Sequence, residues 1–83
     1  MAKTQEEILA WLRKALKEHF SVDPKRVRME TNLFTDLGMD SIDEVELAHH
    51  MMEFTGRRLQ AEEFRILTTV EDVVVSVQRM LEA

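Results

Sequence analysis

The apolar residues of this chain recur at the spacing of an α-helix rather than in the alternation of a strand, and this limits the folds open to it more than any other feature. The clearest case follows Thr4 and Glu7, which form a T-x-x-E capping box. This first helix is expected to end near His19 or Phe20. Its apolar side consists of Ile8, Leu12, Ala15, Leu16 and Phe20. Since the 83 residues include only two Gly and one Pro, little in the chain would interrupt such helices.

Start and stop signals predict two further long helices. One spans about 41–55, because Asp40 or Ser41 can cap its start and Gly56 suits the left-handed position that closes a helix. The other begins after Thr69, which forms a capping pair with Asp72. A short helical turn is expected around 62–64. The expected apolar residues are Ile42, Val45, Ala48 and Met52 in the second helix, with Leu47 and Met51 as further candidates, and Val73, Val74, Val77, Met80 and Leu81 in the last.

A long connection from about 25 to 40 separates the first two long helices. Its apolar side chains predict that it is pinned onto the helices rather than left loose. They are Val27, Met29, Leu33, Phe34 and Leu37. The sequence therefore predicts one all-α domain over residues 1–83, a four-helix bundle with a long loop between helices 1 and 2 and a short third helix.

Charge is unevenly distributed along the chain. The net charge is +3 over residues 1–28, −7 over residues 29–56, which hold no Lys or Arg, and −1 over residues 57–83. An acidic middle third attracts proteins that present Lys or Arg patches, and it makes nucleic acid an unsuitable partner. A solvated acidic helix face is the plainer alternative.

Ser41 is the candidate functional residue. The stretch 37–43, LGMDSID, places its hydroxyl at the start of the acidic helix. Unpaired backbone N–H groups and the positive end of the helix dipole would favour a phosphate esterified there. For an isolated Asp-Ser pair, a simple helix cap is the commoner role.

The residues around Ser41 resemble the acyl carrier protein family. The match is specific over 33–47, LFTDLGMDSIDEVEL, and extends through Gly56 and 68–72, TTVED, to nearly the whole chain. In that family the matching serine bears 4′-phosphopantetheine, which a phosphopantetheinyl transferase attaches from coenzyme A. Its thiol carries acyl intermediates as thioesters between enzymes of fatty acid, polyketide or specialised lipid biosynthesis. The resemblance therefore implies a carrier that is not itself an enzyme.

The same resemblance implies roles for other residues. Asp40 and Ile42 flank the attachment site. The following helix would dock the transferase and the acyl-loading and acyl-processing enzymes through Asp36, Asp40, Asp43, Glu44, Val45, Glu46 and His49. A cleft for part of the acyl chain would be lined by Leu33, Leu47, Leu67 and Val70, side chains that an ordinary core would also need.

Other functions were weighed against this carrier role. The same motif serves aminoacyl or peptidyl carriers, and a carrier-like fold could also stay unmodified and act as an interaction or scaffold subunit. A serine-histidine dyad is excluded, because His49 lies about 12 Å along the helix from Ser41. His49 and His50 point about 100° apart around the helix axis, so they are not expected to bind one metal ion together. These two histidines and His19 are expected at the surface.

The remaining expectations concern setting and partners. The chain has no Cys and so no thiol of its own. It has neither a bilayer-spanning apolar run nor a secretory signal, which predicts a cytoplasmic protein without membrane insertion. The protein is also expected to be a monomer. Arg57, Arg58 and Arg65 make the segment before the last helix less acidic than is typical of fatty-acid carriers, which favours a specialised pathway.

Overall fold

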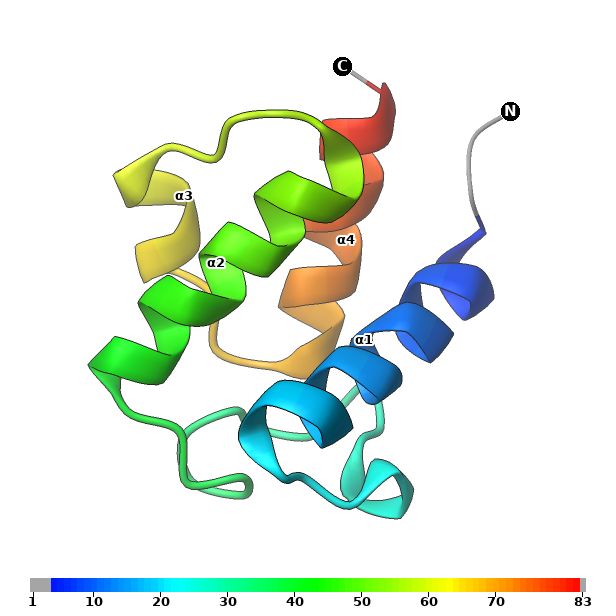
Figure 1. Ribbon diagram of the computed structural model, residues 1–83, viewed down its shortest axis with the longest axis vertical. Helices are drawn as coiled ribbons and strands as arrows, with labels where there is room; N and C mark the ends of the chain where they lie inside the picture. Colours follow the sequence, from blue (N-terminus) through cyan, green and yellow to red (C-terminus); the bar gives the residue numbers. More distant parts are fainter. Residues whose placement is uncertain (1–3, 83) are drawn as a thin grey trace.

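Figure 1 shows the computed structural model, which describes residues 4–82. Over these residues the chain forms α1 (Gln5–Phe20), a 3-10 helix η1 (Pro24–Arg26), α2 (Ser41–Thr55), α3 (Ala61–Arg65) and α4 (Val70–Glu82), without a strand. An isolated antiparallel bridge joins Asn32 to Thr69. α4 packs against both α1 and α2 (Figure 1), and the short α3 borders a surface pocket together with α4. The predicted four-helix, all-α architecture is confirmed.

The helix ends follow the local signals in the sequence. The capping box of Thr4 and Glu7 is present at the start of α1. Gly56 closes α2 with φ of 68°, the left-handed conformation that glycine adopts without a Cβ clash. Ser21 closes α1 in the same conformation, with φ of 57°, although it is not a glycine.

The core forms where α1, α2 and α4 meet. Its fully buried side chains include Ile8, Leu12, Leu16, Leu47, Met51, Val70, Val73, Val74 and Val77. The expectation that Ile42 and Val45 belong to the apolar side of α2 is wrong, since 76% and 44% of their respective surfaces are exposed. The helix buries the expected Ala48 and the two further candidates Leu47 and Met51, and it packs against α4. The exposed side chains of Ile42 and Val45 are therefore accessible to another molecule.

The loop over 21–40 crosses one end of the bundle (Figure 1) and is fastened to the start of α4. The Leu33 N–H donates to the Thr68 carbonyl at 2.8 Å, and the Val70 N–H donates to the Thr31 carbonyl at 2.9 Å. All five apolar residues predicted to pin this loop pack into or against the core. The 3-10 turn η1 lies where the pair Asp23-Pro24 indicates a turn, and the Asp23 side chain caps it by accepting from the Lys25 N–H at 2.9 Å.

Asp72 fastens the N-terminus of α4 in a pH-dependent way. Its Oδ2 accepts hydrogen bonds from the N–H groups of Thr69 (3.0 Å) and Thr68 (2.9 Å). The bond from the Thr69 N–H is the main cause that lowers the pKa of Asp72 below its ordinary value of 3.8, against the opposing effect of desolvation. A carboxyl whose pKa is lowered by folding contributes stability that is present above the unfolded pKa and is lost as pH falls through the folded pKa.

Asp72→Ala is therefore expected to lower the free energy of unfolding by about 1 kcal/mol near neutral pH, because the N–H groups of Thr68 and Thr69 lose their acceptor. Urea unfolding followed by circular dichroism should show this difference begin to shrink as the pH falls below the ordinary value of 3.8 and continue to shrink as the pH passes the lower pKa of the folded carboxyl. The matched control is Glu71→Ala, because the exposed Glu71 side chain makes no hydrogen bond within the described part of the chain. An equal loss in both variants would contradict the capping role.

Candidate functional site

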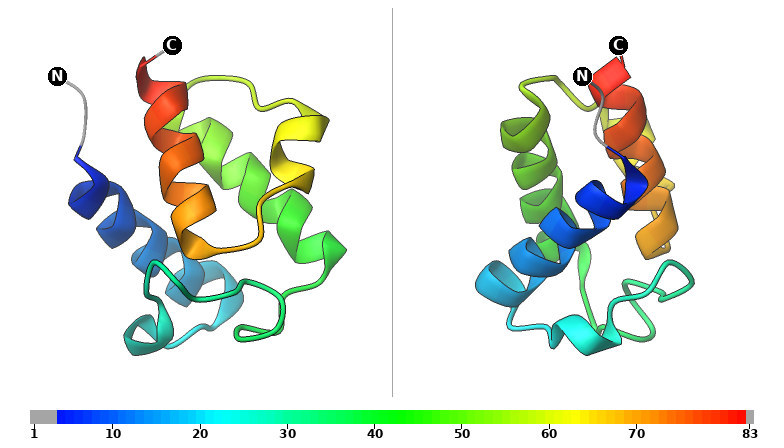
Figure 2. Two further views of the ribbon diagram at one scale, coloured as in Figure 1. Left: turned by 180° about the vertical axis from the view of Figure 1, so that it is seen from behind. Right: turned by 90° about the vertical axis from the view of Figure 1, so that its right-hand side faces the viewer.

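Ser41 is the first residue of α2 and is exposed. The start of α2 lies at a corner of the molecule (Figures 1 and 2). The chain just before it is held in place. Gly38 turns with φ of 69° and donates its N–H to the Phe34 carbonyl at 3.0 Å, and the next residue, Met39, is buried. The serine is therefore presented to solvent from a fixed turn.

Asp40, rather than Ser41, caps α2. Its Oδ1 accepts hydrogen bonds from the N–H groups of Ile42 (3.0 Å) and Asp43 (2.9 Å), and Asp43 Oδ2 accepts in return from the Asp40 N–H at 3.1 Å. Among the residues that the structure describes, none donates a hydrogen bond to the Ser41 hydroxyl or accepts one from it. Its oxygen is free to react.

This cap corrects one expectation about the serine. We expected unpaired N–H groups at the start of α2 to favour a phosphate, but Asp40 already accepts from two of them. The positive end of the helix dipole persists there, and three carboxylates at the first turn, those of Asp40, Asp43 and Glu44, oppose it. The start of α2 therefore favours a phosphate less than an uncapped helix end without these carboxylates would.

The exposed face of α2 gathers most of the predicted docking residues. Ser41, Ile42, Val45, Glu46 and His49 line one shallow surface pocket, because residues three, four and seven apart share a face of a helix. The acids of the first turn border it. This α2 face, defined by these five residues with Asp43 and Glu44, thus combines two exposed apolar side chains with carboxylates around one reactive hydroxyl.

Asp36 lies outside this face. It belongs to the loop, where its Oδ2 accepts from the Asn32 N–H at 2.8 Å and its carbonyl accepts from the Arg26 guanidinium. These bonds shape the loop over 32–38. A docking role for Asp36 would have to coexist with this structural one.

The predicted cleft residues meet in the core. Leu33, Leu47, Leu67 and Val70 are all buried and belong to one apolar cluster. Leu67 also lines a surface pocket between α3 and α4. The packing alone accounts for these four side chains.

The histidines differ from one another in a way that the sequence did not predict. His49 is exposed, but only 21% of the His50 side chain is, and its ring stacks on that of His19 with centroids 4.0 Å apart. The expectation of a surface position is wrong for His50, because the last turn of α1 packs against α2 there. Its position three residues after the buried Leu47 was the available signal.

A second ring contact was also missed. Trp11 of α1 stacks on Phe54 of α2, with centroids 4.4 Å apart and planes 16° from parallel.

Within the described residues, no group of three or more His, Cys, Asp or Glu side chains could hold a metal ion.

Asp40→Ala is expected to lower the free energy of unfolding by about 1 kcal/mol, because two N–H groups of α2 lose their acceptor. Asp40→Asn is the matched control, since its amide oxygen can still accept, and it should stay within a few tenths of a kcal/mol of wild type. Urea unfolding measures both, and equal losses in the two variants would show that the charge rather than the cap is responsible.

Comparisons with known proteins place the chain among similar sequences and structures. The family model described as "Phosphopantetheine attachment site" matches residues 10–75. The chain is 48% identical over 80 residues to "Acyl carrier protein 2" of Ralstonia nicotianae, covering 96% of this chain and 99% of that protein. It is 37% identical over 82 residues to "Meromycolate extension acyl carrier protein" of Mycolicibacterium smegmatis, covering 99% of this chain and 83% of that protein.

A solved structure agrees with these sequence matches. The crystal structure of an acyl carrier protein from Thermotoga maritima superposes with a TM-score of 0.84 at 27% identity, covering 94% of this chain and 91% of that chain. In addition, no helix within residues 4–82 is both long and apolar enough to cross a bilayer.

Proposed function

Because this chain belongs to the acyl carrier protein family and contains the phosphopantetheine attachment domain, we propose that Ser41 is the residue that bears the group and that residues 1–83 act as one carrier domain. The observation that carries the proposal is an exposed serine hydroxyl at the start of α2 that no described residue engages. When attached, the phosphopantetheine supplies the thiol that this Cys-free chain lacks and carries acyl groups on it as thioesters.

The residues around Ser41 fit such a group. The buried Met39 and the Asp40 cap fix the backbone on either side, while the serine side chain itself stays exposed. The corner position leaves open space for a long arm. Among the described residues none is hydrogen-bonded to the hydroxyl as a base, and His49 lies about two turns further along α2. The base has to come from the transferase, and the chain acts as its substrate and not as a catalyst.

The α2 face supports a docking role toward enzymes with basic patches. Its carboxylates attract Lys and Arg over a distance of about 10 Å at moderate salt, and the exposed Ile42 and Val45 supply the apolar contact on close approach. The phosphopantetheinyl transferase and the acyl-loading and acyl-processing enzymes would then bind the same face in turn, each meeting the chain as a monomer.

The test is chemical. The purified chain is incubated with coenzyme A and a broad-specificity phosphopantetheinyl transferase, and its intact mass is measured before and after. One added phosphopantetheine per chain, mapped to the peptide that contains Ser41, is the expected result. An unchanged mass would favour the alternative of an unmodified interaction subunit.

A further inference from the structure

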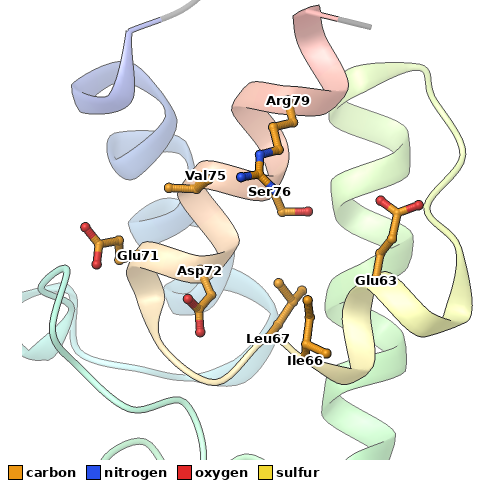
Figure 3. Close-up of a pocket in the computed structure, with 8 residues that line it drawn as sticks. All are labelled: Glu63, Ile66, Leu67, Glu71, Asp72, Val75, Ser76 and Arg79. Carbon is orange, nitrogen blue, oxygen red and sulfur yellow. The ribbon is translucent and has the colours of Figure 1, made fainter.

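A furrow runs between α3, the turn that follows it and α4 (Figure 3). Leu67 and Val75 form its apolar part, and Ile66 stands at its edge with 74% of its surface exposed. A single exposed apolar residue needs no explanation, but this one adjoins other apolar side chains in a depression. The furrow lies apart from the α2 face, with which it shares no residue.

One end of the furrow is cationic. Arg79 and Ser76 lie along α4 at this end, as Figure 3 shows. Arg79 also lines a neighbouring depression together with Arg57, Arg58 and Met80. The two depressions join at Arg79 and Glu63, so three guanidinium groups border one continuous surface.

These guanidinium groups have no ionic partner among the residues that the structure describes. Among the described residues, the acid–base contact within 4.0 Å joins His50 to Glu53 on α2. No such contact involves Arg57, Arg58 or Arg79. Glu63 lies across the furrow from Arg79 without pairing with it (Figure 3). A guanidinium with free donors binds a carboxylate in a defined, often bidentate geometry.

The opposite end of the furrow is acidic, because Glu71 and Asp72 line it at the start of α4. Leu67 and Ile66 lie at the same end of the furrow as Asp72 (Figure 3), so the surface changes from a cationic end to an end that is both apolar and acidic. An occupant that matches this order has carboxylates at one end, and apolar side chains together with a cation at the other. A helical segment with acids in its first turn and a Lys in its last has this order and is favoured by its own dipole.

We propose that the furrow between α3 and α4 is a second docking surface, which binds an amphipathic segment of a partner protein with carboxylates facing Arg57, Arg58 and Arg79 and apolar side chains covering Ile66 and Val75. Its charge is opposite to that of the α2 face. A protein bound here leaves Ser41 open, so the carrier can be held by one protein while another works on its cargo.

The charges favour a protein segment over two other occupants. An anionic membrane would meet Glu62, Glu63, Glu71 and Asp72 as well as the arginines, and a flat anionic surface repels such a mixture. A second copy of this chain could place its acidic α2 face in the furrow, but this contact would cover Ser41, the proposed attachment site.

The experiment is an NMR titration of the isotope-labelled chain with a synthetic helical peptide that carries two Glu in its first turn, Leu and Ile on one face, and Lys in its last turn. Shift changes are expected to gather at 57–58, 66–67 and 75–79. The double variant Arg57→Gln/Arg58→Gln should bind the peptide about fivefold more weakly. It lacks two charges at the edge of the surface, and each exposed ion pair with the peptide contributes about 0.5 kcal/mol. Lys14→Gln/Lys25→Gln, which removes two exposed charges elsewhere, should bind as wild type does.

Several outcomes would overturn the proposal. These are equal weakening in both double variants, equal binding of a scrambled peptide, or shift changes centred on the α2 face. Arginine-dependent binding of vesicles rich in anionic lipid, with no binding of the peptide, would assign the surface to a membrane. Arginine-dependent self-association in sedimentation would assign it to a second copy. Because Ser41→Ala should leave the titration unchanged, failure here is distinct from failure of the attachment site.

Discussion

Ser41→Ala should abolish phosphopantetheine attachment completely, so that the intact mass of the variant stays unchanged after incubation with coenzyme A and the transferase. The reason is chemical, because the phosphodiester forms at a hydroxyl oxygen that alanine lacks. The fold should tolerate the change, since the Ser41 side chain is exposed and the cap of α2 belongs to Asp40.

The chain offers matched controls for this prediction. It has three serines, Ser21, Ser41 and Ser76. Ser76→Ala, on the half-buried side of α4, should still gain one phosphopantetheine, and circular dichroism should show that both variants are as helical as wild type. A mass gain that survives Ser41→Ala would mean that another side chain carries the group.

Much of this site could be predicted because its signals are local. Gly38, the cap at 40–43 and the stop at Gly56 act within a few residues of one another, and helix capping depends on little else. Capping alone does not decide the exposure of Ser41, since Val70, the first residue of the capped α4, is fully buried. The resemblance to the acyl carrier protein family then indicated the attachment of phosphopantetheine, which the capping pattern alone does not imply.

The features that could not be predicted depend on contacts between distant segments. The stacking of His50 on His19 and of Trp11 on Phe54 requires the crossing of α1 and α2, which no single window of sequence specifies. The burial of Leu47 rather than Val45 likewise depends on which side of α2 faces α4. Periodicity gives a helix an apolar stripe, but the rotation of a weakly amphipathic helix is decided by its neighbours.

The cationic furrow shows the same limit. Arg57 and Arg58 are more than twenty residues from Arg79 in the sequence, and only the packing of α4 beside the end of α2 brings them to one surface. The sequence marked Arg57, Arg58 and Arg65 as unusual, but it did not predict that Arg79 would lie beside Arg57 and Arg58 or that Ile66 would line the adjoining furrow.

The double charge reversal Glu44→Lys/Glu46→Lys should lower kcat/KM for phosphopantetheine attachment about thirtyfold. Each exposed carboxylate contributes about 0.5 kcal/mol of attraction to a basic patch, and its reversal adds a repulsion of similar size, so the two positions together amount to about 2 kcal/mol. Ser41 itself and its cap are unchanged. The loss should therefore appear mainly as slower association and should shrink when the ionic strength rises, because salt screens charges at the rim of an interface.

Glu18→Lys/Glu82→Lys provides the comparison for this reversal, because it makes the same change of net charge at exposed positions outside the α2 face. Its rate should stay within about twofold of wild type, which reflects only the weak, screened effect of distant charges. The rates are measured by intact mass at low salt and again at high salt. Equal slowing by both double variants would attribute the effect to net charge, and no slowing by Glu44→Lys/Glu46→Lys would show that carboxylates beside Ser41 do not guide the transferase. Only a local, salt-sensitive loss identifies the α2 face as the surface by which enzymes reach this serine.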